Sequence, residues 1–415
     1  WELCIADDAS PRAHVRPLLE KFAREDPRIK IVFRSENGHI SAASNSALEL
    51  ATGEFTALLD HDDELAPHAL LCLAETLLAH PDAEIVYSDE DKIDESGVRF
   101  DPHFKPDWNP DLLTSQNCFS HLAAYRTATL RAVGGFRVGF EGSQDWDLAL
   151  RVVERVQPSQ IRHIPRVLYH WRAIEGSTAM HLQEKDYATL AARQALEEHF
   201  ARTGEIVTLQ PVRGGHWHVQ RSRPAPPPLV TLIIPTRNRR ELLIPCVESL
   251  LAKTAYPDFE ILVADNDSDD PALLAFYEKA KAQGRFAVVP CPGPFNFSAI
   301  NNRAAQHARG EILGLLNNDL EVMHAEWLDE MVAHAVRPEI GCVGAKLYYP
   351  DFRLQHAGVI TGLGGVAGHA FKNFPRHDPG TPQFRPHLVH NVSAVTAACL
   401  VIRKAVYEQA GGFEE

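Results

Sequence analysis

The sequence predicts an α/β protein made of two tandem domains, each with a mostly parallel sheet covered by helices. An internal repeat indicates the two domains, because residues 41–62 (SAASNSALELATGEFTALLDHD) align with residues 298–319 (SAINNRAAQHARGEILGLLNND). A repeat of this spacing is longer than any solenoid unit. Short β-branched runs also alternate with helical stretches, the pattern of a parallel, helix-covered sheet.

The first domain is expected to span residues 1–210. Its apolar, β-branched runs predict strands at residues 3–6, 29–33, 55–59 and 85–87, with one or two more within 161–169. The stretches between them predict helices at residues 15–22, 40–51, 67–79 and 145–156. Short links between strand and helix favour parallel strand pairing.

A Pro-rich linker is expected at residues 211–228, which include the stiff run RSRPAPPP. The second domain, residues 229–415, opens with an almost pure strand run that ends at Pro235. Nothing corresponds to this opening strand in the first domain. We therefore expect the first domain to lack its N-terminal strand and helix, and the second to lack its C-terminal part.

The charge, the cysteines and the apolar runs of the sequence argue against several classes of function. The 415 residues carry a formal net charge of −14 with no dense Lys/Arg run, which argues against a nucleic-acid partner. The seven cysteines are scattered and form no CxxC pair, as is typical of reduced thiols in a cytoplasmic protein. No apolar run approaches the ~18 residues that a transmembrane helix needs.

An acidic cluster follows the strand expected at residues 55–59. In open α/β sheets, ligands bind beyond the carboxyl ends of strands, where Asp60 and Asp62 are expected. Two carboxylates at positions i and i+2 can share Mg²⁺ or Mn²⁺ and present it to a diphosphate. The structural alternative is a polar turn with Asp63 as a helix N-cap. The corresponding Asn317 and Asp319 of the second repeat favour the functional interpretation.

Further carboxylates end two other strands. Asp7 and Asp8 end the first strand, and Asp265 ends the corresponding strand of the second domain. A carboxylate in this position can accept hydrogen bonds from a base or a ribose hydroxyl. The alternative, which stays open for Asp8, is an Asx turn leading into the next helix.

Two residues later in the first domain are also candidates. Asp145 is expected at the N-terminus of a helix, where free N–H groups stabilise a carboxylate and should keep its pKa low. The alternative is a simple N-cap. His170 ends a strand and can complete the coordination of a metal. A hydrogen-bonded structural histidine is the alternative.

Together these residues resemble the family 2 glycosyltransferases of GT-A fold, a Rossmann-type α/β architecture. More narrowly, they resemble bacterial tandem-domain proteins of O-antigen and other cell-surface polysaccharide biosynthesis. In the first domain the resemblance rests on YSDEDK (87–92), FKPDW (104–108), GGF (134–136), QD (144–145) and LYHWR (168–172). In the second it rests on PTRN (235–238), DND (265–267), NND (317–319), QHAG (355–358) and GGF (411–413).

The resemblance implies transfer of a sugar from a nucleotide-diphosphate sugar to a glycan or lipid-linked acceptor, with inversion and a divalent metal (Mn²⁺ or Mg²⁺). By position, Asp7 would contact the nucleotide base and Asp60 the ribose or sugar. Asp62 would bind the metal, and His170 would complete its coordination. Asp145 matches the acidic residue that serves as general base.

In the second domain, Pro235, Thr236 and Asp265 match nucleotide-contact positions, and Asp319 matches the metal ligand. Asn317 stands where the family usually has the first Asp of its DxD motif, which weakens the expectation of a metal there. The spacing from Phe136 to Asp145 places the base of this domain beyond the last residue.

Two alternatives follow from these observations. Because of Asn317, the second domain is also interpreted as a non-catalytic sugar-nucleotide or glycan-binding module. A sugar nucleotidyltransferase would share the fold class and the metal chemistry, but normally has a Gly-rich loop after its first strand. The resemblance further implies a cytoplasmic location with peripheral association at the inner membrane, because acceptors in such pathways are often lipid-linked.

Overall fold

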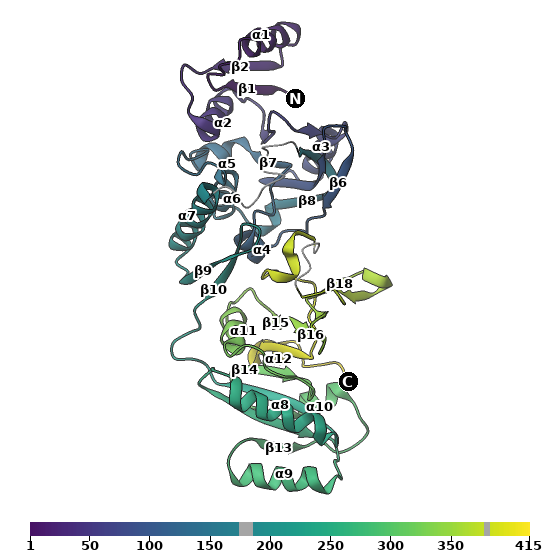
Figure 1. Cartoon of the computed structure of the whole chain (residues 1–415). Coiled ribbons are helices and arrows are strands. Elements are labelled where there is room, and N and C mark those ends of the chain that lie inside the picture. The colour runs from purple at the N-terminus through teal and green to yellow at the C-terminus, as the bar shows by residue number, and fades with distance from the viewer. Residues whose placement is uncertain (174–185, 377–381) are drawn as a thin grey trace. The chain divides into compact units, whose positions relative to one another are not determined.

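The computed structural model describes residues 1–173, 186–376 and 382–415. The chain forms two compact units (Figure 1). Unit 1 comprises residues 1–219 together with 382–391, and unit 2 comprises residues 220–381 and 392–415. The division after Val219 lies inside the expected linker, and the boundaries at 210 and 228 stay a prediction.

Unit 2 is built on a six-stranded sheet of order β13–β12–β11–β14–β20–β15. Its first four strands are parallel, and β20 is antiparallel to both β14 and β15. The strands are β11 (Val230–Thr236), β12 (Phe259–Asp265), β13 (Ala287–Pro290), β14 (Ile312–Leu316), β15 (Cys342–Gly344) and β20 (Cys399–Arg403). Hairpins β16 (Leu347–Tyr348) with β17 (Leu354–His356) and β18 (Val359–Thr361) with β19 (Ala367–His369) lie apart from it.

Helices cover both faces of this sheet. They are α8 (Arg240–Lys253), α9 (Pro271–Ala282), α10 (Phe297–Ala305), α11 (Trp327–Ala335) and α12 (Lys404–Gln409), with a short 3₁₀ turn at Leu363–Gly365. Along β11, Leu232 and Ile234 belong to one hydrophobic core while Ile233 belongs to the other. A strand that is buried on both faces has a continuous apolar sequence, and for this reason the sequence predicts β11 clearly.

The main sheet of unit 1 has the order β3–β7–β5–β8–β4, with β6 paired to β5. Only β5 and β8 are parallel within it. The strands are β3 (Phe55–Ala57), β4 (Glu64–Leu65), β5 (Ile85–Ile93), β6 (Arg99–His103), β7 (Ala123–Arg126) and β8 (Ile161–Arg172). A second hairpin, β9 (Val207–Val212) with β10 (His216–Arg221), follows later in the chain.

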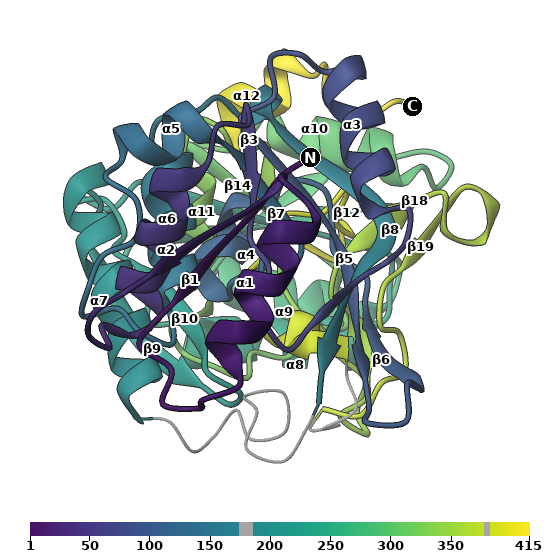
Figure 2. The ribbon, with the colours of Figure 1, turned by 90° about the horizontal axis from the view of Figure 1, so that it is seen from above.

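The helices of unit 1 are α1 (Val15–Glu25), α2 (His39–Leu50), α3 (Ala69–Ala79), α4 (Pro110–Ser115), α5 (Thr127–Ala132), α6 (Gln144–Val153) and α7 (Asp186–Thr203). Short 3₁₀ turns lie at Pro158–Gln160 and Pro382–His387. Strands β1 (Leu3–Asp7) and β2 (Ile29–Phe33) form a separate parallel pair. Helices α1 and α2 lie on opposite sides of this pair, which Figure 2 shows from above.

The strand arrangement of the two units differs at the position of the opening strand β11. In unit 2, β11 lies between β12 and β14. The corresponding strands of unit 1, β1 and β3, belong to different sheets. Among the described residues, no strand pairs with both of them. The expected α/β class holds for both units, with a more mixed sheet in unit 1.

Hydrogen bonds at the start of these strands reflect the same difference. In unit 2 the Thr231 hydroxyl on β11 donates to Glu260 (2.7 Å) and accepts from the Gly310 N–H (2.9 Å). In unit 1 no threonine intervenes, and Glu2 accepts directly from the Gly53 N–H at 2.9 Å. Glu2 thus accepts directly from the glycine N–H of its unit, whereas Glu260 is linked to the equivalent Gly310 N–H through the Thr231 hydroxyl.

A reciprocal amide clamp occurs in both units. Asn45 donates to the carbonyl of Phe136 (2.7 Å) and accepts from its N–H (2.8 Å). Asn302 makes the same pair with Phe413, at 2.9 Å in each direction. The repeat in the sequence is therefore also a repeat of tertiary contacts.

The GGF motifs fit this clamp through their second glycines. Gly135 and Gly412 both have positive φ, at 64° and 74°. A Cβ added to either would lie within 2.5 Å of the clamping amide oxygen. Glycine is required at these positions both for the backbone conformation and for the close approach.

Strand β5 is longer than the predicted strand at 85–87 because it carries a buried charged run. Asp89, Glu90 and Asp91 are all buried, and each has cationic or imidazole partners. Charged side chains are tolerated inside a sheet only when they are paired in this way. Local sequence gives no sign of such partners, so the strand is predicted to end too early.

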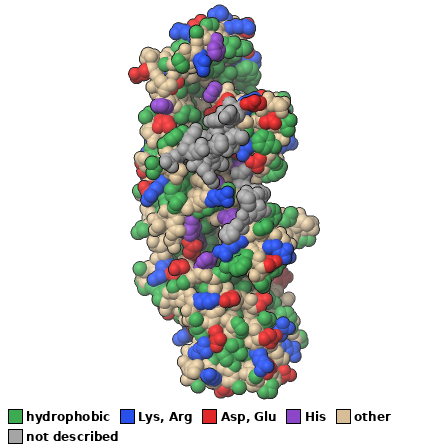
Figure 3. Space-filling view, in the orientation of Figure 1, with side chains coloured by type: hydrophobic (Ala, Val, Ile, Leu, Met, Phe, Trp, Pro, Cys, Tyr) green, Lys and Arg blue, Asp and Glu red, His purple; other side chains and the backbone are tan. Residues whose placement is uncertain are grey.

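The surface carries charged side chains of both signs. Acidic and basic side chains of the described residues are interspersed over the face drawn in Figure 3. Among the helices that the structure describes, none is long and apolar enough to cross a bilayer.

Candidate active site

A cluster of residues of metal-ligand types follows β3 in unit 1. Asp60, Asp63 and His121 each offer one ligand atom, and these atoms lie within 4.8 Å of one another. Strands β3 and β7 pair in antiparallel register, with Ala57 opposite Ala124. Continuing that register places Asp60 beside His121, and His121 Nε2 lies 3.7 Å from Asp60 Oδ2.

Residues of the LYHWR motif hold the acidic loop in place. The Tyr169 hydroxyl donates to Asp63 Oδ2 (2.5 Å) and accepts from the Asp60 N–H (3.2 Å). Arg172 donates its backbone N–H to Asp63 Oδ1 (2.7 Å) and its Nε to the Asp62 carbonyl (2.6 Å). Burial raises the pKa of Asp63. The motif therefore fixes the position of this loop, and its hydrogen bonds to Asp63 offset part of the effect of burial on the pKa.

His121 is held from behind by a buried carboxylate. Glu90 Oε2 accepts from the His121 N–H (3.0 Å) and lies 3.1 Å from its Nδ1. The ring also stacks on Tyr169, with centroids 4.7 Å apart. Burial by itself lowers the pKa of His121, but its interactions with Asp60 and Glu90 outweigh burial and raise the pKa to about 10. Without a bound cation, this imidazole is positively charged at neutral pH.

Asp145 lies in the first turn of α6 and belongs to the same electrostatic environment. Asn117 Nδ2 donates to its Oδ2 at 2.6 Å. The expectation of a low pKa was wrong: burial raises the pKa of Asp145 and outweighs the charge of His121 and the Trp146 N–H, which lower it. Desolvation outweighs the helix terminus because the carboxylate is partly buried. The negative charge of Asp60 raises the pKa further.

The structure brings Asp60 together with Asp63 and His121, and places the two expected metal ligands of unit 1, Asp62 and His170, outside this group. The Asp62 side chain is 35% exposed and lies 3.9 Å from His61. His170 is buried, and its Nδ1 lies 2.6 Å from Asp91 Oδ1. Neither belongs to the cluster of metal-ligand types, and their assignment as ligands stays a prediction.

The carboxylates at the end of β1 have local partners. Asp7 Oδ1 accepts from the Ser10 N–H at 3.3 Å. Asp8 accepts from Arg34 Nε (2.7 Å) and from the Gly38 N–H (3.0 Å). Asp8 thereby anchors the loop that precedes α2, and contact of either residue with a nucleotide stays a prediction.

In unit 2, Thr236 and Asp265 are brought together because they pair on adjacent parallel strands. Asp265 accepts from the Tyr277 hydroxyl (2.9 Å) and the Ser268 N–H (3.1 Å), and Asn318 Nδ2 donates to the Thr236 hydroxyl (3.0 Å). Pro235 precedes Thr236 at the same end of β11.

The acidic end of β14 in unit 2 differs from its counterpart in unit 1. Asn317 donates its backbone N–H to the Ala398 carbonyl (2.9 Å), and Asp319 is exposed. The single cluster of metal-ligand types within the described residues is the one in unit 1. The nucleotide and metal roles expected in unit 2 stay predictions.

Several residues of the site escaped sequence reasoning. Asp63 was expected only as a cap, and His121, Glu90 and Asn117 were not expected at all. His121 is a lone histidine in sequence, and only the antiparallel pairing of β3 with β7 places it at Asp60. The YSDEDK motif was the available signal for Glu90, since three adjacent acids just after a predicted strand call for an explanation.

Residues 1–134 and 231–409 match the sequence profile of the family described as Glycosyl transferase family 2. The chain belongs to glycosyl transferase family 2. Each half of this family 2 chain matches separately, so the internal repeat consists of two copies of the family domain. The expected membership is confirmed.

Curated relatives match this family 2 chain over its full length. It is 50% identical over 422 residues to the uncharacterized protein y4gI of Sinorhizobium fredii, covering 46% of that protein. It is 41% identical over 418 residues to the O-antigen biosynthesis protein RfbC of Myxococcus xanthus, covering 32% of that protein. The chain thus spans about half or less of the length of these relatives.

Solved structures show weaker similarity. A mannosyltransferase from Pyrobaculum calidifontis, in complex with GDP-Man and Mn²⁺, has a TM-score of 0.34 at 18% identity, covering 57% of this chain and 58% of that one. S. aureus TarS 1-349, in complex with UDP-GlcNAc, has a TM-score of 0.36 at 18% identity, covering 48% and 64%. Similarities of this size support no finer assignment.

Proposed function

We propose that unit 1 is the catalytic domain of a glycosyltransferase in cell-surface polysaccharide biosynthesis. It would move a sugar from a nucleotide-diphosphate sugar to a hydroxyl of a glycan or lipid-linked acceptor, with inversion. One observation carries the proposal: a desolvated carboxylate, Asp145, shares its electrostatic environment with Asp60 and His121. A base and a cation-binding group in one site are the two requirements of this reaction.

Asp145 would act as the general base. The acceptor O–H proton would pass to the Asp145 carboxylate as that oxygen bonds to the anomeric carbon and the bond from that carbon to the diphosphate oxygen breaks. The raised pKa makes Asp145 a stronger base than an ordinary aspartate. Asn117 would keep the accepting oxygen oriented through its 2.6 Å hydrogen bond.

Asp60, Asp63 and His121 would hold a divalent metal such as Mn²⁺ or Mg²⁺. The donor set fits, because two carboxylates and an imidazole suit such ions, and Glu90 supports the ring at Nδ1 as outer-sphere carboxylates commonly do. When bound, the metal would neutralise charge on the departing diphosphate. Asp62 and His170 remain the ligand pair that the family resemblance favours.

Unit 2 is proposed to be a sugar-nucleotide or glycan-binding module. The presence of Asn317 at the first position of the DxD motif supports this role over a second metal-dependent centre. Thr236 and Asp265 would contact the nucleotide from the ends of β11 and β12. A cytoplasmic location with peripheral association at the inner membrane is proposed from the acceptor class alone.

The proposal is tested by thermal shift of the full chain against nucleoside diphosphates, with and without Mn²⁺. A nucleotide at ~100 times its Kd adds about 2.7 kcal/mol to the unit that binds it, a shift of several degrees. We expect a metal-dependent shift that disappears in Asp60→Ala. Release of pyrophosphate from a mixture of a nucleoside triphosphate and a sugar phosphate would instead indicate a nucleotidyltransferase. No shift with any nucleotide would overturn the proposal.

A further inference from the structure

A segment of the second repeat's sequence is part of unit 1. Residues 382–391 belong to unit 1, although the residues on either side, up to 381 and from 392, belong to unit 2. We call residues 382–391 the strap. It begins with the 3₁₀ turn at Pro382–His387 and lies beside α4 (Figure 1). Nothing in the sequence pattern predicts this placement.

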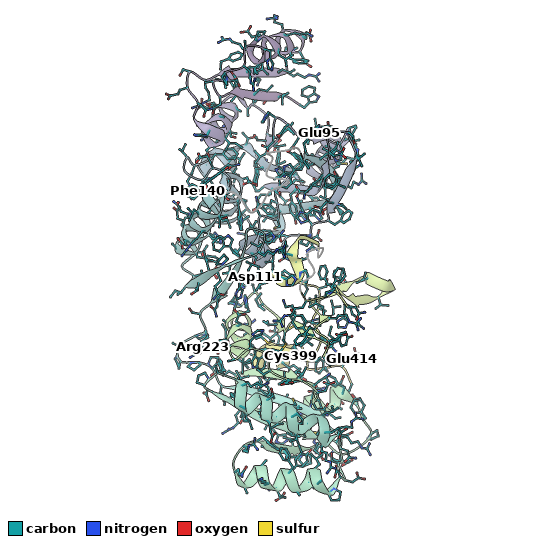
Figure 4. The ribbon with its side chains drawn as sticks, in the orientation of Figure 1. Glu95, Asp111, Phe140, Arg223, Cys399 and Glu414 are labelled. Atoms are coloured by element: carbon teal, nitrogen blue, oxygen red, sulfur yellow. The ribbon has the colours of Figure 1, made fainter. Side chains whose placement is uncertain are left out.

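The strap ends in a dense hydrogen-bonded contact with the start of α4. Asn109 donates to the Asn391 carbonyl (2.7 Å) and accepts from its N–H (2.9 Å). Asn391 Nδ2 donates to Asp111 Oδ2 (2.9 Å), and its Oδ1 accepts from the Asp111 N–H (3.2 Å). Asn109 and Asp111, the latter labelled in Figure 4, are buried. The backbone N–H and carbonyl of Asn391 thus bond to Asn109, and its side-chain amide bonds to Asp111.

Two further contacts support the docking of the strap. Leu388 is 6% exposed and belongs to the same hydrophobic core as Leu113 and Trp146. Arg385 donates from Nη2 to the Phe104 carbonyl at 2.5 Å. The strap is therefore an integral part of the core of unit 1, and α4 is packed against it.

Helix α4 in turn holds the candidate base at two points. The Leu113 carbonyl accepts from Trp146 Nε1 (2.8 Å), and Trp146 is the neighbour of Asp145. Asn117, just after α4, donates to Asp145 Oδ2 (2.6 Å). Asn109, which Asn391 grips, is the N-cap of α4 and accepts from the Leu112 N–H. A continuous chain of contacts thus runs from the strap to the base.

We propose that Asn391 is a positioning residue for Asp145, supplied to the first site by the sequence of the second repeat. The inference rests on the proposed function of unit 1. Without the side-chain amide of Asn391, Asp111 in the first turn of α4 loses two hydrogen bonds, and the Asn117 hydrogen bond to the base loosens. Misplacement of a catalytic group by about 1 Å costs up to ~100-fold in rate. The first site is accordingly complete only when residues 382–391 are present.

The test compares Asn391→Ala with Gln160→Ala in the full chain. Gln160 is a matched control, because its amide also bonds backbone groups of unit 1, at Gln157 and Asp82, away from α4. The rate of nucleoside diphosphate release is measured with UDP-N-acetylglucosamine and GDP-mannose as donors and Mn²⁺ present. We expect kcat to fall ~10- to 100-fold in Asn391→Ala with donor KM within about twofold, and little change in Gln160→Ala. Equal effects of the two variants would overturn the inference.

Exchanging the amide and the carboxylate between positions 391 and 111 distinguishes a positioning role of Asn391 from a general loss of stability. Asn391→Asp places two carboxylates together, and adding Asp111→Asn restores a donor opposite an acceptor. We expect the double variant to recover most of the kcat that Asn391→Asp loses. No recovery, in a double variant that melts at the wild-type temperature, would contradict the proposal.

Amide hydrogen exchange keeps the inference independent of turnover. In Asn391→Ala we expect faster exchange confined to residues 110–117 and 145–147. Faster exchange throughout unit 1, or none at 145–147, would overturn it. If the wild-type chain released no nucleotide from any donor, the proposed function would fail, and the exchange pattern alone would decide the role of Asn391.

Discussion

Glu90 fixes His121 at two points, through the backbone N–H at 3.0 Å and the ring Nδ1 at 3.1 Å. This pairing leaves Nε2 facing Asp60, whose Oδ2 lies 3.7 Å away. Lys105 Nζ lies 3.6 Å from the same Glu90 oxygen, and its side chain is 0% exposed. A buried carboxylate therefore both orients an imidazole of the candidate site and balances a buried ammonium group.

Glu90→Gln is expected to destabilise the fold strongly. The substitution leaves Lys105 buried without its counter-charge, and removing one partner of a buried pair costs about 3–5 kcal/mol. The free energy of unfolding from urea titration measures the loss. The exposed pair of Glu54 with Arg126 supplies the control, since Glu54→Gln should cost no more than about 1 kcal/mol. Similar values for both variants would show that the charge of Glu90 is not needed.

Asp145→Asn is expected to reduce sugar transfer by about 10²–10⁴-fold while leaving donor affinity unchanged. The amide keeps the shape of the side chain but cannot take the acceptor proton. Because burial disfavours the ionised carboxylate, the neutral amide should not weaken the fold. Calorimetric titration with donor and single-turnover rates measure the two quantities. The exposed Asp82→Asn is the control, and transfer retained in Asp145→Asn would exclude this residue as the base.

The rate should depend on pH through Asp145. The base acts only when deprotonated, so kcat falls as pH drops through its raised pKa, above the range of an ordinary aspartate. Asn117 donates to the ionised form, and Asn117→Ala should raise the pKa further. We expect the acidic limb of the kcat profile to move to higher pH in this variant. A limb that stays in place or moves to lower pH would show that Asn117 does not stabilise the ionised base.

Two alternative ligand sets for the metal can be distinguished by substitution. The structure groups Asp60, Asp63 and His121, whereas the family resemblance favours Asp62 and His170. We expect Asp60→Ala and His121→Ala to lower Mn²⁺-dependent nucleotide binding at least tenfold, and Asp62→Ala to have a smaller effect. Titration of Mn²⁺ in the presence of a nucleoside diphosphate measures this. Larger losses in Asp62→Ala and His170→Ala would favour the other set.

The repeated amide clamp predicts matched effects in the two units. Asn45→Ala and Asn302→Ala each leave a backbone N–H and a carbonyl without their partner, at a cost of about 1–3 kcal/mol. Unfolding followed by hydrogen exchange should assign each loss to its own unit. An effect in only one unit would mean that the clamp no longer stabilises the other.

The sequence by itself determined the repeat, the α/β class, several strands and helices of unit 1, and the opening strand of unit 2. The apolar strand runs of β11 and β14 and the helical stretches between strands are local signals, since each depends on neighbours a few residues apart. The same reasoning placed Asp60 and Asp145 near strand and helix ends, where ligands and bases are found.

Tertiary structure decided which side chains meet. His121 reaches Asp60 through the antiparallel register of β3 and β7, and the acids of β5 are buried because their partners come from distant elements. The raised pKa of Asp145 follows from enclosure by the whole unit, which outweighs the local helix terminus. Asn391 contacts Asn109, the N-cap of α4, across 282 residues of sequence. Long-range pairing and desolvation depend on the complete fold, and no local pattern encodes them.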